Sequence, residues 1–343
     1  MEKIKKILKD LCSMVSVSGH EYRSCGKLIE KYKTYFDESY SDNFGNCVFV
    51  KKSGKPNAKK LMIDTHFDEV GMFVTSIEDG GFIHITNVGG LDGRIFPAAE
   101  VTIYGKKEIY GVVASTPPHL QTKESSKSTP KIENILIDTG YAKEELEKIV
   151  TPGDPIRLKG DYCEIANDYV LSRALDNKSC VAAALYALMN AGDILYDVYL
   201  IVSAQEETGK GGCRFAAAEI KPDIAIIADV NFAKCDGVSE FQSIKCEEGA
   251  SVDISSLTDR KVTRSVIKML ENKGIKHQVI CEPDSTGTNN ELVLISGEGI
   301  KTLVLSIPLM AMHTTSEAVS VKDVKSLAEV FGAIFTTELT EER

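Results

Sequence analysis

From about residue 162 onward, the chain alternates between segments with the apolar spacing of helices and short apolar runs typical of buried strands. The helical segments cover residues 176–191, 214–220, 260–272 and 324–335, and the strand-like runs cover 198–204, 224–228, 277–281 and 302–307. Alternation of this kind is typical of an α/β sheet covered by helices. Residues 1–66 add two helices and two strands of the same character. We therefore expect a mixed-sheet α/β/α domain.

The segment between residues 67 and 161 has a different pattern. Short β-rich runs at 71–77, 82–88, 99–104 and 109–114 are separated by Gly and Pro, as in a small all-β domain. The simplest arrangement is a discontinuous α/β domain, residues 1–66 plus 162–343, interrupted near His66 by an inserted β-barrel domain, residues 67–161. Residues 121–131 are rich in Ser, Thr and Lys, which predicts a flexible loop.

Charge and composition narrow the classes of partner. The formal net charge of -10 over 343 residues argues against nucleic-acid binding, which needs a basic surface. Charged residues interrupt the apolar residues of the first helix, so it is not a secretion signal, and no apolar run approaches the roughly 20 residues that span a bilayer. The nine cysteines form no Cys-x-x-Cys pair, and we expect reduced, mostly buried thiols in a cytoplasmic protein.

Polar residues gather where the apolar strands end or the helices begin. Five short pieces share this position, at residues 66–69, 174–178, 205–207, 228–230 and 312–314. Ligands of open α/β sheets bind outside the carboxyl ends of the strands, so several of these pieces should meet there. Together they supply histidines and carboxylates but no cysteine, a mixture that suits zinc, cobalt or manganese in a hydrolytic site.

Glu206 and Glu207 stand next to each other after the apolar run 198–204. Burying a carboxylate without a partner is costly, so a pair in this position indicates a function. Strand geometry would send the two side chains to opposite sides, one toward a metal and the other toward a proton in transfer. The two carboxylates of a glycosidase must instead face each other across the scissile bond, so the adjacency weakens that reading.

Six motifs, in order along nearly the whole chain, resemble those of the M42 family of dinuclear metallo-aminopeptidases, the glutamyl and tetrahedral aminopeptidase group. They are His-x-Asp-Glu-Val-Gly at 66–71, Asn-Val-Gly-Gly-Leu-Asp at 87–92, Pro-Pro-His-Leu at 117–120, Ala-Leu-Asp-Asn-Lys at 174–178, Gln-Glu-Glu-Thr-Gly at 205–209, and Ile-Pro-x4-His at 307–313. Each motif alone is weak, but the ordered set is specific.

The resemblance implies a role for each matching residue. Two divalent metal ions, zinc or cobalt or else manganese, would be bound by five ligands: His66, Asp176, Glu207, Asp229 and His313. The resemblance implies that His66 and Asp229 bind one metal, that Glu207 and His313 bind the other, and that Asp176 bridges both.

Two further carboxylates receive roles from the same resemblance. Glu206 would be the general base and acid. Asp68 would hydrogen-bond the free ring nitrogen of His66 and so orient that ligand.

The family further implies cleavage of amino-terminal residues from short peptides, with the β-barrel domain mediating dimerisation. Its members build homo-oligomers, from dimers to a hollow dodecamer of six dimers. Two other readings stay open: an amidohydrolase or deacylase that acts on small N-acylated compounds with the same metal site, and a scaffold protein that keeps the fold with little activity.

One departure from the family pattern lies at Asn289. The family carries Gly-Gly-Thr-Asp-Ala where this chain has Thr286-Gly287-Thr288-Asn289-Asn290, so a neutral amide replaces a carboxylate. Asn289 is not among the expected ligands. We expect the change to alter the electrostatics of the substrate pocket.

Overall fold

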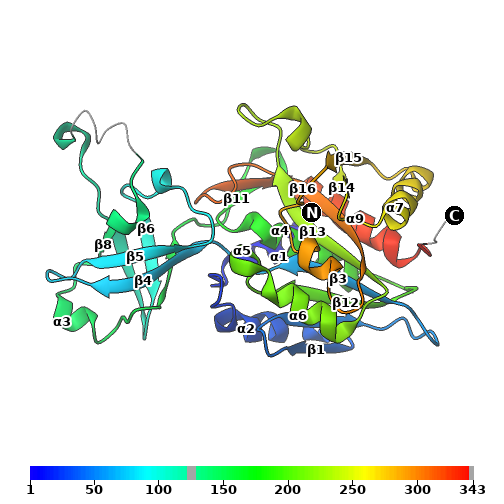
Figure 1. The fold of residues 1–343 in the computed structure, drawn as a ribbon, viewed down its shortest axis with the longest axis horizontal. Coiled ribbons are helices and arrows are strands. Elements are labelled where there is room, and N and C mark those ends of the chain that lie inside the picture. Colours follow the sequence, from blue (N-terminus) through cyan, green and yellow to red (C-terminus); the bar gives the residue numbers. More distant parts are fainter. Residues whose placement is uncertain (122–128, 340–343) are drawn as a thin grey trace.

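A mixed eight-stranded sheet forms the centre of the larger part of the molecule (Figure 1). The computed structural model describes residues 1–121 and 129–339. The sheet order is β1 (Glu38–Ser41), β2 (Cys47–Lys51), β12 (Asp197–Ser203), β3 (Lys60–His66), β13 (Ile224–Phe232), β16 (Lys301–Leu309), β14 (Ala250–Ser255) and β15 (His277–Glu282). Strands β12, β3, β13 and β16 run parallel, while β2 and β14 pair antiparallel to this central group. The expected mixed α/β sheet is confirmed.

Helices cover both faces of this sheet. One face carries α1 (Glu2–Cys12), α2 (Tyr22–Tyr32), α4 (Leu175–Met189), α7 (Arg260–Lys273) and α9 (Val321–Phe335). The other face carries α6 (Gly211–Ile220) and α8 (Asn290–Leu294). Each helix buries its apolar side against the strands, which gives the layered α/β/α arrangement.

Strand alternation decides which side chains meet which layer. Leu61 and Ile63 of β3 belong to the core under α4 and α9, whereas Met62 belongs to the core under α6. Because successive side chains alternate between faces, His66 falls on the side of Met62. The same count along β13 places Asp229 on that side. The polar ends of these strands therefore share the α6 face, beyond the apolar core.

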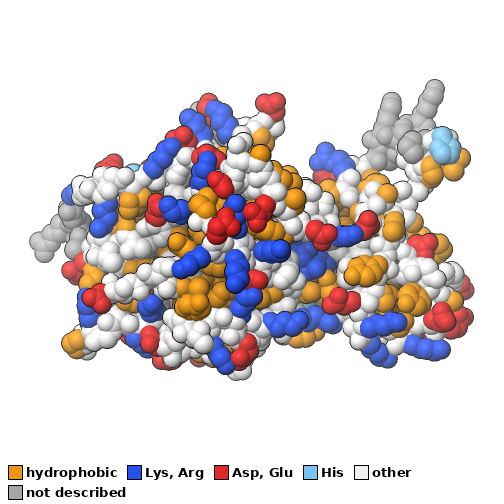
Figure 2. Space-filling model, turned by 180° about the vertical axis from the view of Figure 1, so that it is seen from behind, with side chains coloured by type: hydrophobic (Ala, Val, Ile, Leu, Met, Phe, Trp, Pro, Cys, Tyr) orange, Lys and Arg blue, Asp and Glu red, His pale blue; other side chains and the backbone are white. Residues whose placement is uncertain are grey.

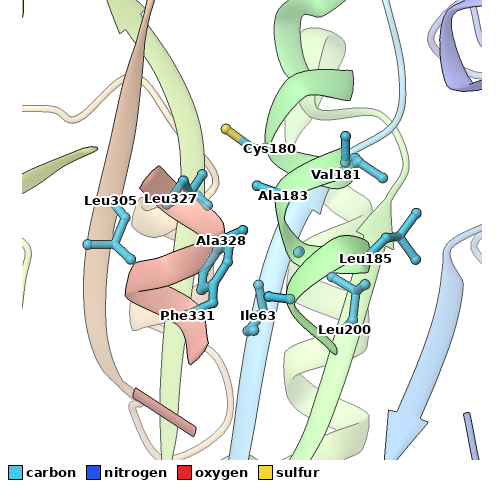
Figure 3. Packing of buried hydrophobic residues seen from close by; sticks show 14 of the residues in the cluster. Ile63, Cys180, Val181, Ala183, Leu185, Leu200, Leu305, Leu327, Ala328 and Phe331 are labelled. Atoms are coloured by element: carbon cyan, nitrogen blue, oxygen red, sulfur yellow. The ribbon is translucent and has the colours of Figure 1, made fainter. Parts of the chain in front are cut away.

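The contact between α4 and α9 anchors the opposite layer. Figure 3 shows Ala183 of α4 and Ala328 of α9 between the two helices, with Phe331 packed beside Ile63. Small side chains on α4 allow this close approach, and Phe331 and Phe335 are fully buried. Burying a side chain of this size contributes about 1.5–3 kcal/mol to stability. This layer holds the start of α4, where Asp176 lies, in a fixed place.

A closed six-stranded barrel forms the smaller part of the molecule, on the left of Figure 1. Around the barrel the strands are β4 (Gly71–Ile77), β5 (Ile83–Val88), β8 (Leu136–Asp138), β7 (Glu108–Val113), β6 (Glu100–Tyr104) and β9 (Pro155–Leu158). A short helix, α3 (Lys143–Leu146), packs against them, and the barrel has its own apolar core. The expected inserted barrel is confirmed. Of the predicted loop at 121–131, residues 122–128 lie outside the described part of the chain.

A small three-stranded sheet, which the sequence did not predict, joins the segment before α4 to the segment after His313. It consists of β10 (Cys163–Ile165), β11 (Tyr169–Ser172) and β17 (Glu317–Ser320), all antiparallel. Strand β11 leads into α4, and β17 follows the loop that carries His313. Pairing of β11 with β17 therefore brings two distant segments of the site together.

The cysteines differ in part from the expectation. Cys25 of α2 and Cys47 of β2 form a disulfide with a Cα–Cα distance of 6.0 Å, so the expectation of nine reduced thiols is wrong for this pair. Helix α2 packs against β2, and this packing places both sulfur atoms in the core. Cys12, Cys180 and Cys213 are free and buried, as expected, whereas Cys163, Cys235 and Cys281 are free and exposed, against the expectation.

Two surface properties complete the description. In residues 1–121 and 129–339, no helix combines the length and the apolar character needed to cross a membrane. On the face seen in Figure 2, basic and acidic side chains are interspersed over both the sheet domain and the barrel.

Candidate metal centre

His66, Asp176 and Asp229 form the first of two groups of potential metal ligands. Their donor atoms all lie within 4.8 Å of one another, and all three residues are buried. The His66 Nε2 atom lies 3.0 Å from Asp176 Oδ1 and 3.6 Å from Asp229 Oδ1. His66 ends β3 and Asp229 lies in the neighbouring strand β13, so the parallel pairing of these strands brings the two side chains together.

Asp176, Glu207 and His313 form the second group, again with donor atoms within 4.8 Å. The His313 Nε2 atom lies 3.2 Å from Glu207 Oε1 and 3.4 Å from Asp176 Oδ2. Asp176 belongs to both groups and uses a different carboxylate oxygen in each. The structure thus brings together all five residues that the resemblance named as ligands, in the two sets it implied.

The outer ring nitrogen of each histidine faces a backbone carbonyl. His66 Nδ1 lies 3.1 Å from the carbonyl oxygen of Asp68, and His313 Nδ1 lies 2.8 Å from that of Gly90. A carbonyl oxygen can only accept, so Nδ1–H donates in both contacts and Nε2 is the ring nitrogen that faces the carboxylates. A proton on Nε2 is donated to those carboxylates, and a metal bound through Nε2 would take the place of that proton.

The charges of the site favour a cation. Burial lowers the pKa of both histidines, but the carboxylates outweigh it: Asp229 and Asp176 raise the pKa of His66 well above its ordinary value, and Asp176 and Glu207 raise that of His313 to about 11. Burial also raises the pKa values of Glu207 and Asp229. Three carboxylates around two imidazoles therefore hold an excess of negative charge, which divalent cations would neutralise.

The sequence indicated that Glu206 and Glu207 end a strand, but the structure places both in a helical turn. Gln205 has a left-handed backbone with φ 60°, which ends β12 and starts a single helical turn, α5 (Glu206–Gly209). The two side chains therefore diverge from the first turn of a helix. Glu207 turns to His313, while Glu206 Oε1 has no hydrogen-bond partner among the described residues and lies 3.6 Å from Lys210 Nζ. Burial raises the pKa of Glu206 to about 8.

Asp68 holds this turn through its carboxylate. Its Oδ1 accepts a hydrogen bond from Glu206 N–H and its Oδ2 one from Glu207 N–H, each at 3.0 Å. These are the free amides at the start of α5, so Asp68 acts as a cap. The contact of Asp68 with His66 is made by the backbone carbonyl, and its carboxylate lies 3.6 Å from Nδ1. Asp68 thus links both halves of the centre.

Glu317 is a buried residue of the site that the sequence did not indicate. Its Oε1 accepts from His313 N–H at 2.8 Å and its Oε2 accepts from Asp176 N–H at 3.1 Å. Burial raises the pKa of this carboxyl to about 8. The only sequence signal was an acidic residue at the start of a four-residue apolar strand, four positions after His313.

A second buried network supports the segment that follows His66. Glu69 pairs with Arg173 at 2.6 Å and with Lys178 at 3.2 Å, and all three side chains are buried. Although burial alone would raise it, the pKa of Glu69 is lowered to about 2 by Arg173 and Lys178. The pairing joins the start of the barrel to α4, next to Asp176.

The side chain of Asn289 faces the protein interior, and its effect on the electrostatics of the substrate pocket stays a prediction. Its side chain is buried, and its Nδ2 donates to Asp64 Oδ2 at 2.7 Å and to Ser203 Oγ at 3.0 Å. Asn289 carries no carboxylate itself, but its hydrogen-bond partner Asp64, on β3, does. Burial raises the pKa of Asp64 to about 7, against the Asn289 hydrogen bond.

A cleft of about 360 Å³ opens beside the ligand groups and Glu206. The Pro-Pro-His-Leu segment lies on a loop of the barrel, and its described residues do not line this cleft. Two imidazoles and three carboxylates are the donor types that zinc, cobalt and manganese accept. The residues present therefore fit a pair of divalent ions that share Asp176.

Comparisons with known proteins agree with this geometry. The family model described as M42 glutamyl aminopeptidase matches residues 45–330. The lysyl aminopeptidase of Pyrococcus furiosus is 28% identical over 338 residues, which are 96% of each chain.

Two solved structures share the fold over nearly their whole length. An aminopeptidase from the archaeon Desulfurococcus kamchatkensis matches with a TM-score of 0.91 and 26% identity, over 98% of this chain and 95% of the other. The TET1 peptidase of Pyrococcus horikoshii, described as able to assemble into a tetrahedron or a large octahedral shell, matches with a TM-score of 0.85 and 27% identity over 98% and 100%. The chain belongs to the M42 glutamyl aminopeptidase family.

Proposed function

We propose that this protein is a dinuclear metallo-aminopeptidase that removes amino-terminal residues from short peptides. The observation that carries the proposal is the pair of ligand groups joined by Asp176. His66 and Asp229 would hold one ion, Glu207 and His313 the other, and Asp176 both. Bound there, divalent ions would supply Lewis acidity, which lowers the pKa of a bound water and polarises a scissile carbonyl.

Glu206 is the proposed proton carrier. Its Oε1 is free of hydrogen bonds among the described residues, and the side chain lines the cleft beside both ligand groups. Its carboxylate accepts the proton of the attacking water and passes it to the leaving amine. Asp68 positions this carboxylate by fixing the backbone of the turn on which it stands.

Substitution of Glu206 tests the proton-carrier role. Glu206→Gln keeps the shape of the side chain but cannot accept the proton, and general acid–base catalysis is typically worth about 10²- to 10⁴-fold in rate. We expect hydrolysis of amino-terminal amides to fall by that range while two metals stay bound, measured by steady-state kinetics and by elemental analysis of the same sample. Glu271→Gln, an exposed residue of α7, is the matched control. Full activity of Glu206→Gln would remove Glu206 from the mechanism.

The free amino terminus decides between peptidase and deacylase. Pairs of peptides with free and acetylated amino termini should differ sharply, with only the free form cleaved. Cleavage of the acetylated form alone would establish the deacylase reading instead. Fewer than one bound metal per chain after addition of zinc or cobalt would indicate a scaffold protein.

We also propose a homo-oligomer, a dimer or a dodecamer of six dimers. Support comes from the assembly stated for the TET1 peptidase and from exposed apolar side chains on the barrel, among them Tyr110 and Val112. Multi-angle light scattering at micromolar concentration measures the mass. A monomer across that range would refute the assembly and leave the chemistry unaffected.

A further inference from the structure

The cleft at the metal centre continues beyond it, toward the end of β15. Past the ligands it is lined by Asn231, Phe232, Glu282 and Ser285. A second hollow, of about 470 Å³, shares these four residues and runs on past Asp284. The hollow space therefore reaches from the proposed reaction centre to a region that no proposed catalytic residue occupies.

Glu282 is the carboxylate in this extension. It ends β15 and is half-buried, and its Oε1 accepts a hydrogen bond from Asn231 Nδ2 at 2.9 Å. Asn231 is itself held by the Phe232 N–H, which donates to its Oδ1 at 2.7 Å. Among the described residues, no hydrogen bond or ion pair reaches the second oxygen, Oε2. Glu282 is thus held in place through one oxygen while the other remains available.

Away from the metal centre, the charged side chains that line the hollow around Glu282 are carboxylates. The described residues that line the two hollows include no lysine or arginine, and Asp284 adds a second carboxylate. Lys210, the cation beside the metal centre, is engaged by Glu291 at 2.9 Å and by the Thr288 carbonyl at 2.6 Å. Burial, together with the charge of Asp229, raises the pKa of Glu282. A cationic group on a ligand, placed beside Glu282, would favour the charged form of this carboxylate and lower its pKa again.

Apolar side chains line the path to this carboxylate. Val230, Phe232 and Met312 line the same cleft as Glu282, and Phe232 is 48% exposed. Lysine and arginine pack their methylene stems against apolar surface and keep the charged group in a polar place. The apolar wall fits the methylene stem of a lysine or arginine, and the free oxygen of Glu282 fits its charged group.

We infer that Glu282 is a specificity-determining residue that selects peptides whose amino-terminal residue is lysine or arginine. The inference rests on the aminopeptidase activity proposed above, because the side chain that enters this extension belongs to the residue whose amine lies at the metal centre. An acidic amino-terminal residue would meet Glu282 and Asp284 with like charge and is disfavoured.

The test compares amino-terminal lysine, leucine and glutamate in otherwise identical fluorogenic substrates. We expect kcat/KM of the natural protein to fall in the order lysine, leucine, glutamate, and the lysine advantage to shrink as salt is raised. A preference for glutamate, or equal rates for lysine and leucine at low salt, would overturn the inference. Absence of turnover on all three would instead refute the proposed function.

Three variants locate the selectivity. Glu282→Gln should lower kcat/KM for the lysine substrate by about 10- to 100-fold, the value of a hydrogen bond to a charged group, and change that for leucine less than about threefold. Glu282→Lys should reverse the preference toward glutamate. Glu271→Gln, which removes an exposed carboxylate outside both hollows, should leave the ratios unchanged.

Inhibition by free amino acids gives a second readout. Free lysine should inhibit hydrolysis of the leucine substrate by the natural protein more strongly than free glutamate does. This measurement does not depend on the folding of any variant. A lysine-to-leucine ratio that is the same in the natural protein and in Glu282→Gln would overturn the role of Glu282.

Discussion

The buried pair of Asp64 and Asn289 allows a sharp test, because only one of the two can carry a charge. In Asn289→Asp, the amide that donates to Asp64 Oδ2 at 2.7 Å becomes a second carboxylate. Neither side chain has access to solvent that could screen the repulsion. At neutral pH the variant must either lose the hydrogen bond or keep a proton on one of the two carboxyl groups.

The expected cost follows from this contact. Loss of a buried hydrogen bond to a charged group, together with the proton that must be retained, amounts to about 2–4 kcal/mol. For a chain of 343 residues, the entropy of unfolding is about 0.7 kcal/mol/K, so the apparent Tm should fall by about 3–6 °C. Thermal unfolding followed by circular dichroism at pH 8 measures the shift.

The pH dependence has a definite sign. Burial raises the folded-state pKa of Asp64 to about 7, above its ordinary value, so the protonated form stabilises the fold and this contribution is lost as pH rises toward 7. A second carboxylate raises the folded-state pKa of the pair further. The deficit of Asn289→Asp should therefore be small at pH 5, where one carboxyl can donate to the other, and full at pH 8.

The exchanged variant, Asp64→Asn with Asn289→Asp, is the control. It restores one carboxylate and one amide in contact and should recover most of the lost stability, whereas Asn289→Asp alone should not. Equal Tm values for Asn289→Asp and the natural protein at pH 8 would refute the argument from a shared buried charge. So would an exchanged variant as unstable as the single one.

Three further predictions concern the support of the site. Glu317→Gln places an NH₂ group against a backbone N–H of His313 or Asp176, and should weaken zinc binding about 10- to 100-fold in a chelator competition; unchanged affinity would show that Glu317 does not hold the ligands. Gly212→Ala places a Cβ atom 2.3 Å from a backbone carbonyl and should sharply lower Tm, whereas Gly332→Ala, with nothing within 4 Å, should change it little; equal shifts would contradict the steric account. Removal of metals by a chelator should lower Tm, and zinc, cobalt or manganese should restore it in proportion to binding; a Tm indifferent to metal would refute a folded-state metal site.

The sequence predicted the centre of the fold because its central strands are long, apolar and buried on both sides. Strands β3, β12, β13 and β16 have this character, and the polar residues that follow them had to meet at one edge. Strand β14 was not predicted, because two of its six residues, Ser251 and Asp253, interrupt the apolar run. Its Ser251 and Asp253 are in fact buried and hydrogen-bonded to each other, and Asp253 also accepts from Ser306.

The details of the site depend on contacts that no local pattern contains. The turn at Glu206 requires a left-handed Gln205 and a cap from Asp68, 138 residues earlier. The environment of Asn289 is set by Asp64, 225 residues away in sequence. Strands as short as β10, β11 and β17 carry too few residues for a periodic signal. Residue types could therefore be predicted, but their partners could not.

The contact between His313 and the Gly90 carbonyl joins the barrel to the candidate metal centre. Gly90 lies just after β5, so one of the five donor side chains takes its orientation from a part of the molecule that contributes none. Cutting out the barrel would leave every ligand in the chain yet free one imidazole to turn. A displacement of the barrel would therefore act on the orientation of His313 through this one hydrogen bond.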